Sequence, residues 1–121
     1  MDIYQSIFQK MEMMGILRVR QYVVIENPPY LPLCIDRLDE NLFALSQNPI
    51  INGEMVADPD IEIRIYPEEK RAEPTVYQDQ HERKVVYPET GMVNLKIKNE
   101  LCVFLDRWLN ELLLQGFKWG P

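Results

Sequence analysis

The polar residues whose types and spacing are suited to chemistry lie on one face of a predicted β-hairpin in the middle of the chain. Carboxylates grouped in this way can bind a divalent cation, or act as general acid and base where burial or a like-charged neighbour shifts one pKa. A cross-strand ion pair between Arg64 and Glu73 accounts for the same residues without any ligand. We assign no catalytic residue and no metal site, and we predict a binding surface. Its residues are Asp60, Glu62, Arg64, Glu73 and Tyr77.

A second interpretation of this hairpin is a small metal-assisted hydrolase. It would use Asp60, Glu62 and Glu73 together with His81, the one histidine of the chain. A zinc site needs more nitrogen or sulfur ligands than a single histidine supplies. The sequence also has no glycine-rich phosphate loop, nucleophile elbow or His-Glu-x-x-His motif. We therefore rank the hydrolase second, and we expect no cofactor.

The first arm of the hairpin alternates apolar and polar residues, as a strand with one buried face does. Ile61, Ile63 and Ile65 form its apolar face. With a turn at residues 67–70, one register brings apolar residues together on one face and polar residues on the other, and this agreement favours that register. Pro74 has no N–H, so the second arm is expected at a sheet edge or with a bulge there. The predicted pairs are Tyr66 with Arg71, Ile65 with Ala72, Arg64 with Glu73, Ile63 with Pro74, Glu62 with Thr75 and Ile61 with Val76.

Hydrophobic periodicity predicts the elements around this hairpin. An N-terminal helix begins at an Asp2 cap and stops at Gly15, and turn signals at Asn48-Pro49 and Asn52-Gly53 precede the hairpin. The predicted fold is α+β, with an antiparallel sheet of about five strands, an N-terminal helix, and a long C-terminal amphipathic helix packed on one face. Besides the hairpin arms, strands are predicted over residues 16–26, 31–38, 42–47 and 85–87.

The C-terminal helix has the clearest pattern in the chain. Asn94 is its predicted N-cap and Gly116 its stop, with apolar residues at spacings of three and four between them. Trp108 lies in the middle of this apolar stripe, so we expect it to rest on the isoleucine face of the hairpin. Phe117 and Trp119 follow the helix, and either anchor the tail in the core or form an exposed apolar patch for a partner.

Length and composition limit the class of protein. At 121 residues, with 46% hydrophobic and 26% charged residues, the chain is expected to fold as one domain over residues 1–121. No apolar run approaches the roughly 20 residues that a membrane helix needs, so we expect no membrane partner and a cytoplasmic location. A net charge of −6 weighs against nucleic acid as a partner and leaves a nucleic-acid-associated protein as the last alternative. Cys34 and Cys102 lie in apolar segments and are expected to be reduced core thiols.

Four groups of residues carry a resemblance to a known family. They are Asp-Pro-Asp-Ile-Glu-Ile-Arg-Ile-Tyr at 58–66, Ala-Glu-Pro at 72–74 with Tyr-Gln at 77–78, Phe-Leu-x-x-Trp-Leu at 104–109, and Gln-Gly-Phe at 115–117. This pattern resembles a family of small bacterial proteins defined as a domain of unknown function. The middle and end of the chain also resemble, more distantly, the YqiB-like proteins. The likeness covers roughly residues 20–117 and leaves out the N-terminal helix.

The resemblance implies a setting on bacterial conjugative elements or phage-like islands, and it brings no catalytic residue with it. The acidic composition and the absence of catalytic motifs also favour a non-enzymatic binding protein. The leading hypothesis is therefore a non-enzymatic protein-binding accessory module of a bacterial mobile element or phage. Its expected partner is another protein.

Overall fold

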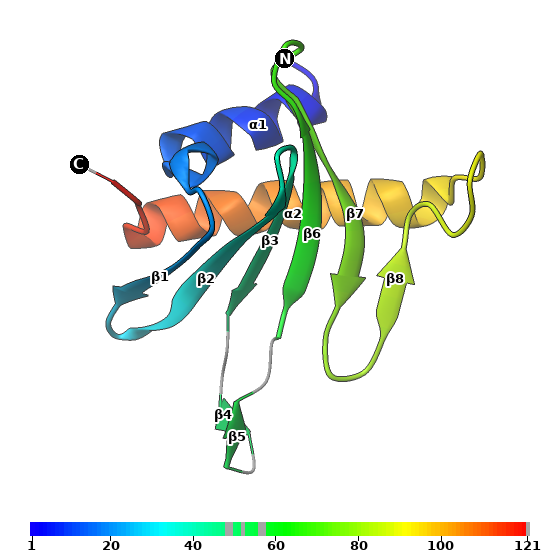
Figure 1. The fold of residues 1–121 in the computed structure, drawn as a ribbon. Helices are drawn as coiled ribbons and strands as arrows, with labels where there is room; N and C mark the ends of the chain where they lie inside the picture. The colour runs from blue at the N-terminus through cyan, green and yellow to red at the C-terminus, as the bar shows by residue number, and fades with distance from the viewer. Residues whose placement is uncertain (48–49, 52, 56–57, 121) are drawn as a thin grey trace.

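The structure, a computed structural model, describes residues 1–47, 50–51, 53–55 and 58–120. It has the predicted α+β architecture, with two helices against one face of a six-stranded antiparallel sheet (Figure 1). The helices are α1 (Ile3–Met13) and α2 (Leu95–Gln115), and a 3₁₀ turn, η1 (Ile16–Arg18), follows α1. In spatial order the strands are β1 (Tyr22–Asn27), β2 (Tyr30–Asp39), β3 (Leu42–Gln47), β6 (Asp60–Tyr66), β7 (Arg71–Gln78) and β8 (Arg83–Val85).

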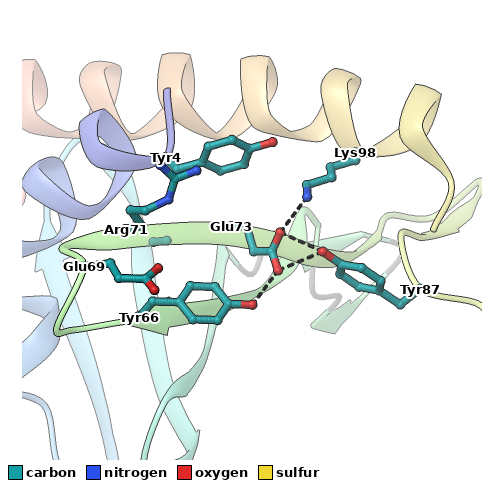
Figure 2. Close-up of a pocket in the computed structure, with 8 residues that line it drawn as sticks. Tyr4, Tyr66, Glu69, Arg71, Glu73, Tyr87 and Lys98 are labelled. Carbon is teal, nitrogen blue, oxygen red and sulfur yellow. Dashed lines mark hydrogen bonds and ion pairs between the residues drawn. The ribbon is translucent and has the colours of Figure 1, made fainter. Parts of the chain in front are cut away.

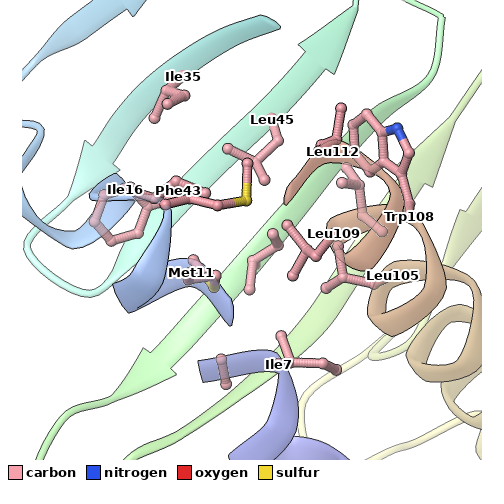
Figure 3. Packing of buried hydrophobic residues seen from close by; sticks show 14 of the residues in the cluster. Ile7, Met11, Ile16, Ile35, Phe43, Leu45, Leu105, Trp108, Leu109 and Leu112 are labelled. Carbon is pink, nitrogen blue, oxygen red and sulfur yellow. The ribbon is translucent and has the colours of Figure 1, made fainter. Parts of the chain in front are cut away.

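A hydrophobic core lies between this sheet and the two helices (Figure 3). Ile7 and Met11 on α1 meet Leu105 and Leu109 on α2, and none of the four side chains is exposed. Apolar residues of β2, β3 and β6 belong to the same cluster. The amphipathic faces of both helices are therefore buried against one layer of strands, which is the packing that the apolar stripes require.

Trp108 occupies the position expected from the stripe on α2. Its side chain is 8% exposed and lies in the core cluster with the three isoleucines of β6. The Phe104 ring stacks on the indole with ring centroids 6.0 Å apart, and Tyr77 of β7 meets Phe104 edge-on at 5.4 Å. This aromatic row joins the middle of α2 to the β7 side of the sheet.

Both ends of α2 follow the predicted caps. The Asn94 side chain accepts a hydrogen bond from the N–H of Ile97, and Gly116 ends the helix with a left-handed φ of 96°. Phe117 then folds back and is buried in the core, which confirms the tail-anchor alternative for this residue and excludes the exposed patch. Trp119 remains exposed.

The central hairpin has the predicted register up to Pro74. Beyond it Thr75 is an extra residue on β7, so Glu62 pairs with Val76 and Ile61 with Tyr77. The predicted pairs of Glu62 with Thr75 and of Ile61 with Val76 are therefore wrong. Pro74 cannot donate a hydrogen bond to the ladder, and a bulge was one of the two expected ways to accommodate it. This bulge reverses the face of the sheet on which the later side chains of β7 lie.

The first strand is shorter than predicted, because β1 begins at Tyr22 and not within residues 16–21. Gly15 leaves α1 with a φ of 79°, and the chain makes the η1 turn before the strand. Ile16 and Val19 are buried in the core. These β-branched residues, which the sequence pattern assigned to a strand, serve instead to cover the core at the end of α1.

A second, two-stranded sheet precedes the hairpin. It consists of β4 (Ile50–Ile51) and β5 (Glu54–Met55). Turns were predicted on both sides of β4, at Asn48-Pro49 and at Asn52-Gly53. Apart from Gly53, these positions lie outside the described residues.

Candidate functional site

A buried carboxylate forms the centre of the candidate site. Glu73 on β7 is 5% exposed. The Tyr66 hydroxyl donates to its Oε1 at 2.7 Å, and the Tyr87 hydroxyl lies 2.9 Å from Oε1 and 2.8 Å from Oε2. Lys98 Nζ forms an ion pair with Oε2 at 3.2 Å, and Figure 2 shows the three donors converging on the carboxylate. A buried charge is tolerated only with such partners, so we call these four residues the Glu73 network.

The β6–β7 hairpin places two members of the network. Tyr66 ends β6 and Glu73 lies near the start of β7, on opposite sides of the turn at residues 67–70. Lys70 adopts a left-handed φ of 53° in this turn, which lets the chain reverse within four residues. The tyrosine ring and the carboxylate thus come from neighbouring strands at one end of the hairpin.

The other two members come from the segment that follows β8. Tyr87 lies just beyond β8, and Lys98 lies in the first turn of α2. The N–H of Asn94 donates to the Val86 carbonyl at 2.7 Å, which ties the start of α2 to the end of β8. Because of this tie, the helix cap and the network depend on the same piece of backbone.

A pocket of about 390 Å³ lies beside the network. On its α1 side, the Arg71 guanidinium lies 4.7 Å from the centroid of the Tyr4 ring, and Lys98 Nζ lies 5.3 Å from it. Both are cation–π contacts. Arg71 also forms an ion pair with Asp2, the N-cap of α1. The lining residues, most of them labelled in Figure 2, are Tyr4, Tyr66, Glu69, Arg71, Ala72, Glu73, Tyr87 and Lys98.

The network keeps its tyrosines neutral and its lysine charged. Burial and the hydrogen bond to Glu73 raise the pKa of Tyr66 to about 12, and the same causes raise the pKa of Tyr87. Burial alone would lower the pKa of Lys98, but its hydrogen bonds to Glu73 and Tyr87 outweigh burial and raise it. At neutral pH the two hydroxyls are therefore donors and the lysine is a cation.

The cysteines are buried thiols, as expected. Cys102 lies one helical turn after Lys98, and burial raises its pKa to about 11. A thiol with this pKa is protonated at neutral pH and is a poor nucleophile.

Only one of the predicted binding residues reaches the pocket. Glu73 lines it, whereas Asp60, Glu62 and Arg64 lie along β6 away from its lining. Arg64 stands opposite Glu73 in the ladder, but the ion pair of Glu73 is with Lys98, and no pair between Arg64 and Glu73 occurs among the described residues. The predicted cross-strand pair is wrong, because Lys98, in the first turn of α2, supplies the cation.

Tyr77 was expected on the polar face with Glu62 and Arg64. The Thr75 bulge turns it to the other face, where it packs against Phe104. Its hydroxyl donates to Asp79 Oδ2 at 2.8 Å. Tyr77 therefore belongs to the core side of the sheet, and its assignment to a polar surface with the β6 residues is corrected.

The residues of the hydrolase alternative do not converge. Burial raises the pKa of Asp60, with smaller contributions from the charges of Glu62 and Asp36 and a partial offset from Arg83. His81 is exposed in the turn between β7 and β8. Within the described ranges, no three His, Cys, Asp or Glu side chains are placed to hold a metal ion.

Three members of the network were not predicted as site residues. Tyr66 and Tyr87 end strand-like segments, and Lys98 lies on the polar side of a helical pattern. The one signal in the sequence was the pairing of Tyr66 with Arg71, which places Tyr66 close to Glu73 across the hairpin turn. Nothing local in the sequence points to Tyr87 or Lys98, because tertiary packing brings them to Glu73.

The fold and the site together define a small α+β protein with a tyrosine-lined polar pocket at one side of its sheet. The chain belongs to the family described as Domain of unknown function (DUF6908), whose model matches residues 2–118. The match includes α1, which the resemblance seen in the sequence had left out. No curated protein and no solved structure matches the chain. Of the helices described, none is long and apolar enough to span a bilayer.

Proposed function

We propose that the chain is a non-enzymatic protein-binding accessory module, and that the pocket beside Glu73 receives a group of the partner protein. The observation that carries this proposal is the closure of the Glu73 network. Both carboxylate oxygens are occupied by Tyr66, Tyr87 and Lys98. A carboxylate whose two oxygens are both engaged by donors of the protein itself is poorly placed to accept a proton from a substrate or to attack one.

The lining of the pocket suits recognition. Tyrosine rings supply rigid contact area at a low cost in conformational entropy, and they are enriched at protein interfaces. Tyr66 and Tyr87 are already fixed by their hydrogen bonds to Glu73, so a partner would not have to order them. Arg71 and Glu69 add one charge of each sign to the lining, which suits a polar protein surface.

The spacing along β6 weighs against the hydrolase alternative. Asp60 pairs with Gln78 and Arg64 pairs with Glu73, so Asp60 and Glu73 lie four residues apart along the ladder. At roughly 3.3 Å per residue this is about 13 Å, which is too far for two carboxylates to share one cation or one water. The nucleic-acid alternative is weaker still, because a net charge of −6 opposes the binding of phosphates.

The setting on a bacterial mobile element, and the cytoplasm as the place of action, belong to the same proposal. Their support is the resemblance of the hairpin and C-terminal motifs and the acidic composition. Mapping genes of the family against the boundaries of integrated elements tests the first, and cell fractionation tests the second. Genes scattered through conserved chromosomal operons would count against the mobile-element setting.

A photo-crosslinking amino acid tests the binding site directly. Glu69, at the exposed rim of the pocket, is replaced by the crosslinker, and Asn110, on the exposed side of α2, receives it as the matched control. We expect a discrete protein adduct from position 69 in cells that carry the gene, and none from position 110. Tyr87→Ala should remove the adduct, because the Tyr87 ring forms one wall of the pocket. Equal labelling at both positions, or none at position 69, would contradict the proposal.

A further inference from the structure

The strand at the far side of the sheet from the pocket has an unpaired edge. Within the described part of the chain, β1 pairs with β2 alone. The N–H of Arg37 donates to the carbonyl of Gln21 at 2.7 Å, so Gln21 bonds towards β2. Bonding in an antiparallel ladder alternates along the strand, which turns the N–H and C=O groups of Tyr22, Val24 and Glu26 away from β2.

Apolar side chains of β1 are incompletely covered on both faces. Tyr22 is 55% and Val24 43% exposed on one face, while Val23 and Ile25 remain half-buried on the core face. Exposed apolar residues gather in this part of the sheet, since Tyr30, Leu31 and Leu38 of β2 are exposed as well. An added strand would cover both rows of β1 and would satisfy its outward backbone groups together.

The opposite edge strand shows how this chain protects an edge. β8 has three residues, and two of them, Arg83 and Lys84, are basic. Short length and positive charge are both devices that block pairing with another chain. β1 has six residues, no lysine, arginine or proline, and one charge, Glu26. It therefore lacks the protection that the same sheet has at its other edge.

We infer that β1 pairs with β1 of a second copy of this chain, antiparallel and centred on Val24, so that two sheets become one. The strand is self-complementary in this register. Val24 lies opposite its own copy, and Tyr22 lies opposite Glu26. The two Glu26 residues are then about 13 Å apart, further than the Debye length of about 8 Å at physiological salt. A foreign strand would have no such built-in match, so the second copy is the occupant favoured here.

Net charge sets the conditions for this association. Each chain carries −6, so two copies repel one another at low ionic strength. Salt screens this repulsion and leaves backbone hydrogen bonds and apolar contacts almost unchanged. The dimer should therefore tighten when salt rises from about 0.05 M to about 0.5 M.

Sedimentation equilibrium of the full chain, from about 1 μM to about 200 μM, tests the inference. Val24→Pro removes an outward N–H and leaves the bonds of β1 to β2 in place, whereas Val24→Thr keeps the N–H and serves as the matched control. We expect a concentration-dependent dimer that Val24→Pro weakens at least about 100-fold and Val24→Thr less than about 10-fold. Circular dichroism checks that both variants fold.

Amide exchange gives a readout that needs no variant. The N–H groups of Tyr22 and Val24 should exchange slowly at high protein concentration and quickly after dilution.

If Val24→Pro does not fold, Val24→Lys keeps the N–H but adds an edge charge, and it should also be monomeric. A wild-type chain that stays monomeric throughout, or variants that dimerise as well as wild type, would overturn the inference. A strand of another protein found on β1 in place of the second copy would overturn it too.

Discussion

The β7–β8 side and the β1 side of the sheet differ in how their backbone groups and charges are covered. At the β7–β8 side, Pro74 and a bulge interrupt the ladder, β8 is short and basic, and a buried carboxylate is enclosed by side chains from α2 and the segment before it. At the β1 side the strand is regular, apolar and open. At the β7–β8 side the polar groups make internal contacts around a pocket, whereas at the β1 side backbone groups are left without a partner strand from the described part of the chain. The two sides are therefore separate surfaces, and each can be altered without the other.

The largest expected effect tests the core that both sides share. Trp108→Ala should destabilise the protein by about 3 to 5 kcal/mol, because it removes a buried aromatic side chain that Phe104 stacks against and leaves a cavity. Arg107→Ala, at the exposed neighbouring position, should cost less than about 1 kcal/mol. Chemical denaturation of both variants gives the two values. A Trp108→Ala protein as stable as the parent would show that the aromatic row does not support the β7 side.

The next effect concerns the buried ion pair of the pocket side. Glu73→Gln should cost about 2 to 3 kcal/mol, because Lys98 loses its counter-charge in a largely buried position and the new amide meets three donors. Glu100→Gln breaks the solvent-exposed pair with Lys84, at 3.5 Å, and should cost less than about 0.5 kcal/mol. Urea denaturation compares the two. Equal costs would mean that the Glu73 network behaves as a surface pair.

Alkaline pH should weaken the pocket side through Tyr66. The pKa of Tyr66 is raised to about 12 in the folded protein, above its ordinary value near 10, so the folded state holds a proton that the unfolded state releases. The stabilisation is therefore complete below about pH 10 and is lost as pH rises towards about 12. With the ring 39% exposed, solvent screening limits the loss to roughly 1 kcal/mol. Tyr66→Phe should remove that part of the pH dependence in thermal unfolding, and an unchanged profile would contradict this account.

The smallest effect is expected at the β1 side. Val24→Lys changes an exposed side chain whose backbone groups already point outward, so the stability of the monomer should change by less than about 0.5 kcal/mol. Unfolding at low micromolar protein measures the monomer alone. A loss above about 2 kcal/mol would mean that Val24 supports the fold itself, and the distinction drawn between the two sides would fail.

Local periodicity in the sequence was sufficient to predict most of the fold. The alternation of Ile61, Ile63 and Ile65 indicated a strand with one buried face, and the spacing around Trp108 indicated a helix that lies across it. Caps at Asn94 and Gly116 set the helix ends. These features follow from the chain alone, because a period of two or of 3.6 residues and the bonding needs of a helix end are properties of neighbouring residues.

Tertiary structure decided which partner Glu73 takes and which face Tyr77 occupies. Sequence register placed Arg64 opposite Glu73, yet Lys98 is its ion-pair partner, and only the packing of α2 against the sheet brings that lysine to the carboxylate. Pro74 left a sheet edge and a bulge as alternatives, and the structure has the bulge, whose extra residue Thr75 reverses the side chains in the rest of β7. The open edge of β1 is likewise visible only in the tertiary structure, because the apolar composition of a strand does not tell an edge strand from a central one.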